Sequence, residues 1–237
     1  MAVYYKTKGF VFKKENRGEA DKIFSIFTHD YGKIELRCRG IRKINSKLRY
    51  NIDNFYYSEI EFVQGKNYKT LTDASIINKP QLTLSKLEFL NNIAELLDSF
   101  IKGEQRDDKI FDLLSKTFEN LLKIKSYKLR NFYNYFFWNF ISELGHMPET
   151  KKCAKCYSTL SPYHLYFSNK NGGIICRYCF NCEKDAKKTN SDIVKTLRLF
   201  LDGEYEVINK LKINPRSENL LNQITDNYYK YMKLVYN

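Results

Sequence analysis

The sequence predicts an α+β protein built from three parts: a small five-stranded β-barrel, an all-α helical domain, and a cysteine-rich insertion that interrupts the helices. Three observations lead to this prediction. Strand-like alternation is confined to residues 1–80, helical spacing of apolar residues follows, and five of the six cysteines fall within thirty residues. We therefore expect a barrel domain at 1–80, a helical domain at 81–152 and 190–237, and an insertion at 153–189.

The barrel prediction rests on five short runs with the period-2 pattern of a strand that has one buried face. In the third run, Ile34, Leu36 and Cys38 alternate with charged residues until Gly40 ends the strand. Five short strands with glycine-containing turns are typical of a small closed or partly open barrel, and the OB-fold is the natural candidate. The expected strands are residues 4–14, 22–28, 34–39, 55–63 and 68–77.

From residue 81 onward, apolar residues recur at intervals of three and four, which is the spacing of one helix face. Ser85, with Glu88 three positions later, predicts a capping box, and Asn190 or Ser191 is the expected cap of a later helix. The aromatic stripe within residues 132–141 indicates core packing, because burial of such a stripe stabilises a helix bundle. The expected helices are residues 85–101, 108–124, 129–144, 191–201 and 215–235, with a short segment at 205–211.

A basic stretch covers residues 31–49, where seven cations stand against the single acid Glu35. A strand that presents cations on its open face and continues into a cationic loop suits a polyanion laid across it. The alternative is a solvated edge strand whose charges only discourage edge-to-edge pairing. The candidate anion-binding residues are Lys33, Arg37, Arg39, Arg42, Lys43, Lys47 and Arg49.

The formal net charge of +13 is concentrated in two segments. Residues 1–80 contain 16 lysines and arginines against 9 acids, and residues 153–189 contain 6 against 2. Local basic faces indicate a phosphate-rich partner more strongly than an overall high pI does. The candidate surface cations of the second segment, which either extend a nucleic-acid surface or are plain solvated charge, are Arg177, Lys184, Lys187 and Lys188.

The cysteines have the spacing of a metal site. Cys153-x2-Cys156 and Cys176-x2-Cys179 are separated by nineteen residues, and each pair can place two sulfur atoms around one point. Four thiolates fill every position around zinc, so we expect one structural zinc ion per chain and no catalytic metal. Cys182 forms a second CxxC with Cys179 and could replace Cys176, and five packed free thiols are the remaining alternative.

The sequence predicts a cytoplasmic protein without a membrane partner. We expect no secretory signal before the first strand, and the most aromatic run, residues 132–141, is far shorter than a bilayer span. Metal-like cysteine spacing also fits a reducing compartment better than a disulfide-stapled secreted domain.

An ordered series of short motifs runs through the first part of the chain. The motifs are GFVFKKENRGEADKIFSIFTHDYGKIELRCRGIRK at residues 9–43, SKL at 46–48 and TLT at 70–72. No single motif is specific for a protein family, but the order and spacing of the motifs are. In this order the chain resembles the N-terminal domain of the RecO family of bacterial recombination mediators.

The resemblance implies a non-enzymatic protein of DNA repair and recombination whose OB-fold binds single- and double-stranded DNA. It also implies annealing of complementary strands. With the partner RecR, such a protein helps load recombinase onto single-stranded DNA coated with the binding protein SSB, whose acidic tail docks on the helical domain. The expected location is the cytoplasm, in association with the nucleoid.

Residue by residue, the family's basic positions fall on Arg39, Arg42, Lys43 and Lys47. Arg37 departs from the family pattern, which usually has an apolar or small residue there. For the metal site, the phrase Gly-Gly-x-x-Cys-x-x-Cys is similar to that of zinc-bearing relatives. That motif favours Cys176 and Cys179 as the second ligand pair over Cys179 and Cys182.

The sequence features bear on two other classes of function besides DNA binding. An RNA-binding assembly factor is the alternative, since OB barrels and zinc ribbons also serve ribosomal and tRNA partners. An enzyme is disfavoured, because the sequence contains no GxxxxGK[ST], GxSxG or HExxH motif.

Overall fold

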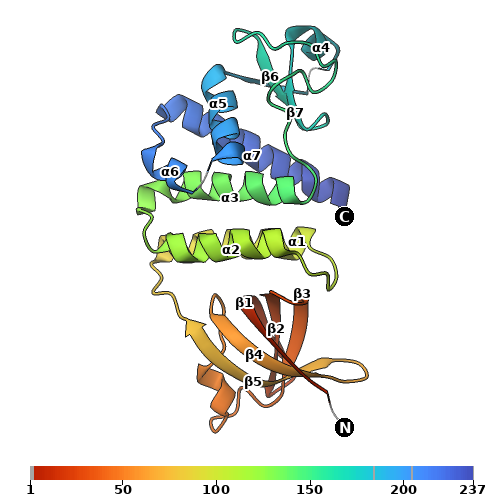
Figure 1. Cartoon of the computed structure of the whole chain (residues 1–237), viewed down its shortest axis with the longest axis vertical. Coiled ribbons are helices and arrows are strands. Elements are labelled where there is room, and N and C mark those ends of the chain that lie inside the picture. The colour runs from red at the N-terminus through yellow and green to blue at the C-terminus, as the bar shows by residue number, and fades with distance from the viewer. Residues whose placement is uncertain (1–2, 184, 204, 237) are drawn as a thin grey trace. The chain divides into compact units, whose positions relative to one another are not determined.

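The computed structural model describes residues 3–183, 185–203 and 205–236 (Figure 1). Its internal contacts divide the chain into two compact units, Met1–Leu122 (unit 1) and Lys123–Asn237 (unit 2). Unit 1 contains a β-barrel and two helices. Unit 2 contains the remaining helices and the cysteine-rich residues 153–189, which we call the cysteine lobe.

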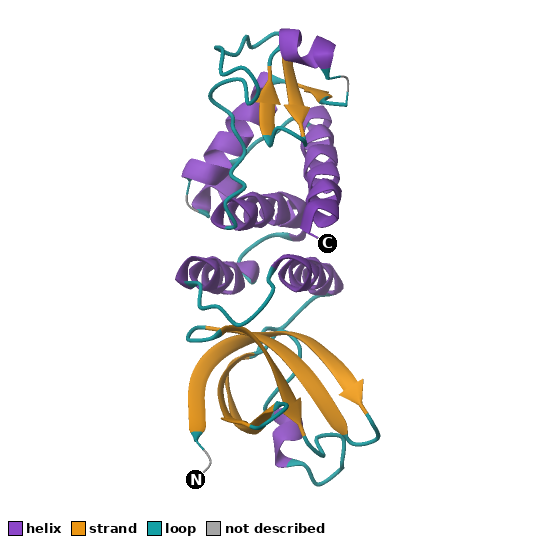
Figure 2. Cartoon of the chain, turned by 90° about the vertical axis from the view of Figure 1, so that its right-hand side faces the viewer, coloured by secondary structure: helices purple, strands orange, loops and turns teal. Residues whose placement is uncertain are grey.

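The five strands of unit 1 form a closed barrel in the order β1-β2-β3-β5-β4 (Figure 2). Strand β4 pairs back onto β1, and the parallel pair β3 and β5 joins through Leu36 opposite Lys69 and Arg37 opposite Thr70. The predicted five-stranded barrel is confirmed. Its strands are β1 (Tyr4–Arg17), β2 (Asp21–Thr28), β3 (Gly32–Cys38), β4 (Tyr57–Gln64) and β5 (Lys69–Asn78).

The barrel interior is apolar and follows the alternation of the sequence. Ile34, Leu36 and Cys38 of β3 are all buried, as predicted from their period-2 spacing. In the β2–β3 ladder Ile26 lies opposite Ile34 and Phe24 lies opposite Leu36, so both strands turn the same kind of side chain inward. Removal of this apolar surface from water is the main stabilising contribution to such a core.

Helices α1 (Leu84–Phe100) and α2 (Asp108–Leu121) lie over one end of the barrel within unit 1 (Figure 2). The ring of Phe10 in β1 contacts Phe118 of α2 at 4.5 Å between centroids and Phe111 at 5.5 Å. The predicted domain division assigns these helices, from residue 81 on, to the same domain as the later helices, whereas the contacts group them with the barrel. The predicted boundaries stay a prediction.

The helix caps differ in how well the sequence predicts them. Helix α1 begins at Leu84 behind Thr83, whose backbone is extended, so the expectation that Ser85 starts a capping box is wrong. Thr83 is the residue at which the extended chain turns into the helix, and Ser85 already lies inside the first turn. For α5, Asn190 is the cap, and its side chain accepts a hydrogen bond from the Ile193 amide at 3.0 Å.

Unit 2 is built around α3, whose predicted aromatic stripe is completely buried. Among the polar pairs that join α3 to α7, Trp138 Nε1 donates to Thr225 Oγ1 at 3.1 Å, and Asn134 donates to Asn222 at 2.8 Å. The helices are η2 (Ser126–Lys128), α3 (Leu129–Glu143), α5 (Ser191–Asp202), α6 (Glu206–Lys210) and α7 (Pro215–Tyr236).

The cysteine lobe contains a small antiparallel sheet of order β7-β6-β8 and the short helix α4, which follow α3 in the chain (Figure 1). The lobe has its own small core, which includes Cys153, Tyr166, Ile175 and Cys179. Its elements are β6 (Leu165–Ser168), β7 (Gly173–Ile175), α4 (Arg177–Cys182) and β8 (Lys187–Thr189). The fold class predicted from the sequence, barrel then helices with an inserted four-cysteine lobe, is confirmed.

Among the residues that the structure describes, no helix combines the length and the hydropathy that crossing a membrane requires.

Candidate nucleic-acid interface and metal centre

The loop that follows β3 is held in place by its backbone. Gly40 adopts a left-handed conformation (φ 65°), which glycine reaches without the steric penalty that other residues meet. Ile41 is buried and anchors the loop, while the Arg42 amide donates to the Ala20 carbonyl at 2.9 Å. The Arg42 guanidinium also donates to the Gly18 carbonyl at 3.1 Å. The β1–β2 turn therefore supports this loop.

Five of the predicted cations lie on this loop and on the adjoining 3-10 helix η1 (Lys47–Tyr50), and all five are exposed. Helix η1 lies at the end of the barrel away from α1 and α2 (Figure 2). Within the described part of the chain, none of the five forms an ion pair with a carboxylate. We call this set the loop cations; they are Arg39, Arg42, Lys43, Lys47 and Arg49.

Two loop cations line a hollow of about 310 Å³ at this end of the barrel. Arg42 and Arg49 share its wall with Lys22 and Asp53. Asp53 is itself ion-paired with Lys14, so its negative charge is compensated from outside the hollow. The hollow therefore presents a surplus of positive charge.

Lys22 is missing from the set predicted from the sequence. It lies at the start of β2, opposite Cys38 at the end of β3, so the strand ladder brings it beside the loop. Lys22 could be found only from the register between β2 and β3. A run of alternating residues does not specify that register by itself.

Two predicted residues, Lys33 and Arg37, do not join the loop cations. Lys33 lies at the start of β3, six residues or about 20 Å of strand before Arg39, and it pairs with Asp98 of α1 at 2.9 Å. Arg37 pairs with Asp21. Hydrogen bonds from the Gly40 amide and from Arg37 lower the pKa of Asp21, so this carboxylate is charged at neutral pH.

The second predicted site is a cluster of four sulfur atoms. Cys153, Cys156, Cys176 and Cys179 place their Sγ atoms within 4.8 Å of one another, and those of Cys156 and Cys176 are 3.8 Å apart. A tetrahedron with Zn–S bonds of about 2.3 Å has edges of about 3.8 Å, so the four sulfurs fit a tetrahedral metal ion. Cys182, the alternative ligand, is exposed and lies outside this group.

The protein environment favours a thiolate within the cluster. Hydrogen bonds with the Ser158 hydroxyl and amide lower the pKa of Cys156 to about 6. The Cys176 amide points at Cys153 Sγ at 3.4 Å. Burial raises the pKa of the Cys179 thiol, because it disfavours the charged thiolate. A cation close by would be needed for this thiol to ionise. Four soft sulfur ligands suit a metal such as zinc.

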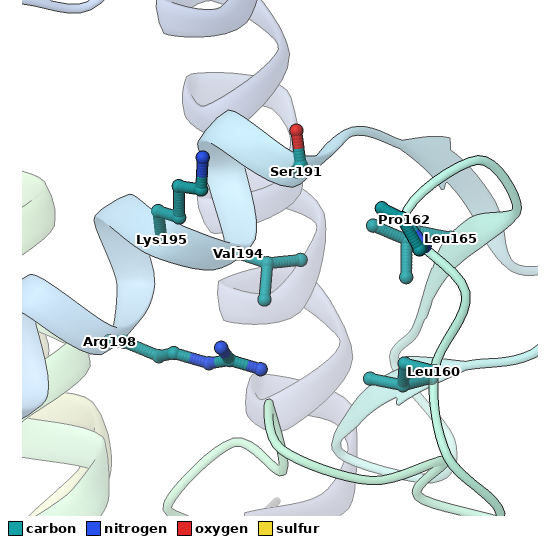
Figure 3. Close-up of a pocket in the computed structure, with 7 residues that line it drawn as sticks. All are labelled: Leu160, Pro162, Leu165, Ser191, Val194, Lys195 and Arg198. Carbon is teal, nitrogen blue, oxygen red and sulfur yellow. The ribbon is translucent and has the colours of Figure 1, made fainter.

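A second hollow, of about 180 Å³, lies in unit 2 between α5 and the segment before β6 (Figure 3). Leu160, Pro162 and Leu165 face Val194 across it, and the Arg198 side chain extends toward it from α5 (Figure 3). Its lining also includes Lys195 and Ser191 of α5. Arg198 donates to the Thr150 carbonyl, and its buried Nε has no acceptor among the described residues.

Comparison with known proteins gives consistent matches over the whole chain. The profile described as Recombination protein O N terminal matches residues 1–80, and that described as Recombination protein O C terminal matches residues 81–232. A protein named DNA repair protein RecO from Dehalococcoides mccartyi is 33% identical over 215 residues, which are 89% of this chain and 83% of that protein.

Two further proteins of the same printed name extend the similarity. The one from Alkaliphilus metalliredigens is 29% identical over 226 residues, 94% of this chain and 91% of that protein. The one from Listeria monocytogenes is 27% identical over 228 residues, 94% of this chain and 88% of that protein.

Proposed function

Because the chain belongs to the RecO family of DNA repair proteins, we propose that it is a non-enzymatic mediator of recombinational repair that binds single- and double-stranded DNA. The observation that carries this proposal is the set of loop cations, which are exposed at one end of the barrel and form no ion pair with a carboxylate among the described residues. Cations held in this way remain available for phosphate groups.

The mechanism follows from phosphate neutralisation. Each contact between a loop cation and a phosphate releases a condensed counterion, so binding is steeply dependent on salt and indifferent to sequence. A protein that lowers the repulsion between two strands and holds them together promotes their annealing. Chemistry by the protein is not needed for this step, and the four-cysteine site would hold a structural zinc ion that stabilises the lobe.

The proposal extends to two protein partners, RecR and the acidic tail of SSB. The hollow beside α5 supports a docking place for the tail, since its apolar wall and the cations Lys195 and Arg198 suit an acidic peptide with an apolar side chain. At about 180 Å³ the hollow is smaller than the 300–1,000 Å³ typical of small-molecule sites. It therefore suits one or two peptide side chains better than a cofactor.

The decisive experiment measures annealing of complementary strands coated with the cognate SSB, with and without RecR. We expect the protein to accelerate annealing without ATP, and we expect excess structured RNA to compete poorly at fixed salt. A protein that prefers the RNA would instead be an assembly factor. Acceleration that survives replacement of the loop cations would contradict the assignment of the site.

A further inference from the structure

The aromatic side chains of the cysteine lobe fall into two groups. Tyr166 and Phe180 pack inside it, with their rings stacked 3.9 Å apart and nearly parallel. Tyr157, Tyr163 and Tyr178 are instead 72%, 84% and 76% exposed. In the part of the chain that the structure describes, none of these three rings has a ring contact or a side-chain hydrogen bond.

Tyr157 occupies a position that strongly favours glycine. Its φ is 59°, in the left-handed region, where a side chain other than glycine costs about 1–2 kcal/mol. The turn around the first cysteine pair uses only the backbone of this residue, whose amide donates to the Cys153 carbonyl at 2.8 Å. The ring contributes nothing to that turn, so the strain of keeping it points to a role outside the fold.

A second exposed tyrosine adjoins the other cysteine pair, here within helix α4. Tyr178 stands between Cys176 and Cys179, next to the exposed Arg177, as Tyr157 directly follows Cys156. Because the four sulfur atoms lie together, the backbones of Tyr157 and Tyr178 both adjoin the sulfur cluster. We call this part of the lobe the cluster edge; it carries the exposed side chains of Tyr157, Tyr178 and Arg177.

We propose that this edge is a second binding site for unpaired nucleotides, separate from the loop cations of unit 1. Tyr157 and Tyr178 stack on bases, and Arg177 contacts the sugar-phosphate backbone. Proteins that bind single strands without sequence preference usually combine aromatic rings, which stack on any base, with a nearby cation. Paired bases would not expose the faces that the tyrosines need, so the site is specific for single strands.

Charge also favours a nucleic acid over a protein partner. The lobe carries 6 lysines and arginines against 2 acids. Lys187 and Lys188 of β8 are exposed, whereas Lys155 pairs with Glu183 at 3.3 Å and Lys184 lies outside the described residues. This inference rests on the proposed function only in naming DNA, and not RNA, as the strand.

The test compares the full-length protein with Tyr157→Gly and Tyr178→Ala. Binding is measured with fluorescent oligo-dT, with oligo-rU of equal length, and with an abasic strand that keeps the phosphates but lacks the bases. We expect each variant to bind oligo-dT about fivefold or more weakly, the size of one lost stacked base, and to bind the abasic strand as the wild type does. Metal content and melting temperature of Tyr157→Gly should not fall, because glycine relieves the strain.

Tyr163→Ser is the matched control, since it removes an equally exposed ring that does not adjoin a cysteine of the cluster, and it should leave binding unchanged. Retention of oligo-dT affinity by both tyrosine variants would overturn the inference, as would a loss that is equal on the abasic strand. A tyrosine effect confined to oligo-rU would overturn the assignment to DNA. Normal strand binding with lost stimulation by RecR would assign the edge to a protein. If the wild type binds no strand at all, the proposed function fails as well.

Discussion

The guanidinium of Arg37 donates two hydrogen bonds to Asp21 Oδ2, from Nε at 2.8 Å and from Nη2 at 2.6 Å. The other carboxylate oxygen, Oδ1, accepts from the Gly40 amide at 2.8 Å. Asp21 therefore ties the start of β2 to the end of β3 and to the first turn of the loop. Arg37 supports the loop that carries the cations, and its own charge is already compensated.

Replacement of Asp21 by Asn should lower the melting temperature at about pH 7, and this difference should shrink as the pH falls below about 4. The pKa of Asp21 is lowered in the folded protein, so its stabilising contribution is present above the unfolded pKa of about 3.9 and is lost as the pH falls through the folded value. Thermal unfolding of both proteins across this range measures the difference. Glu19→Gln, which removes an exposed acid from the neighbouring turn, is the matched control and should leave the melting temperature at about pH 7 unchanged.

Simultaneous replacement of Arg39, Arg42 and Lys43 by Gln should weaken binding to all DNA sequences alike. For single strands the slope of log K against log salt changes by about 0.7 per phosphate contact, so three lost contacts flatten it by about 2. Titrations at several salt concentrations measure the slope. The matched control replaces three exposed lysines elsewhere on the barrel, at positions 6, 8 and 66, and an equal flattening there would argue against a localised site.

Lys33→Gln should destabilise unit 1 and leave DNA binding unaltered. The Lys33 side chain is only 14% exposed, and its amine donates to Asp98 Oδ1 at 2.9 Å and to the Ile101 carbonyl at 3.2 Å. Loss of a hydrogen bond to a charged group costs about 1.5–3 kcal/mol. Denaturant unfolding measures this cost. A changed salt slope would mean that Lys33 contacts phosphate after all.

Cys153→Ser should abolish metal binding and loosen residues 150–189 while the barrel stays folded. The buried Cys153 sulfur is part of both the cluster and the lobe core, so its loss removes a ligand where no other cysteine can substitute. Metal analysis together with amide hydrogen exchange tests both parts of this prediction. Cys182→Ser should keep its metal, because Cys182 lies outside the cluster.

Lys195→Glu should weaken binding of an acidic peptide with a terminal Phe by reversing one charge at the rim of the hollow beside α5. We expect a loss of about fivefold or more, since a like charge opposes the ligand where an opposite charge attracted it. Fluorescence anisotropy with a labelled peptide measures the affinity. Lys212→Glu reverses an exposed charge that does not line the hollow, and it should bind the peptide normally.

Local patterns in the sequence predicted much of the fold. The alternation of Ile34, Leu36 and Cys38 fixed one face of β3, and the aromatic stripe of α3 marked the centre of unit 2. Cysteine spacing likewise anticipated the sulfur cluster. The three- and four-residue strands of the lobe were not predicted, because so short a segment barely completes one period of alternation.

Long-range pairing could not be predicted in the same way. Arg37 and Asp21 are 16 residues apart, and Lys33 and Asp98 are 65 residues apart. Whether a basic residue meets a carboxylate or remains free depends on strand register and helix placement, which leave no mark in a run of charges. This is why the sequence grouped Lys33 and Arg37 with the loop cations and omitted Lys22.

The polar pair between Trp138 and Thr225 joins residues 87 positions apart, and this separation has a consequence for synthesis. Every strand of the barrel has left the ribosome long before α7 is made, so the barrel can form while translation continues. The aromatic face of α3 is covered only later, because α5 and α7 supply residues that pack against it, and chains emerge at only about 5–20 residues per second. For several seconds the apolar side chains of α3 therefore lack the partners that cover them in the folded protein, and such exposed surface is prone to aggregation.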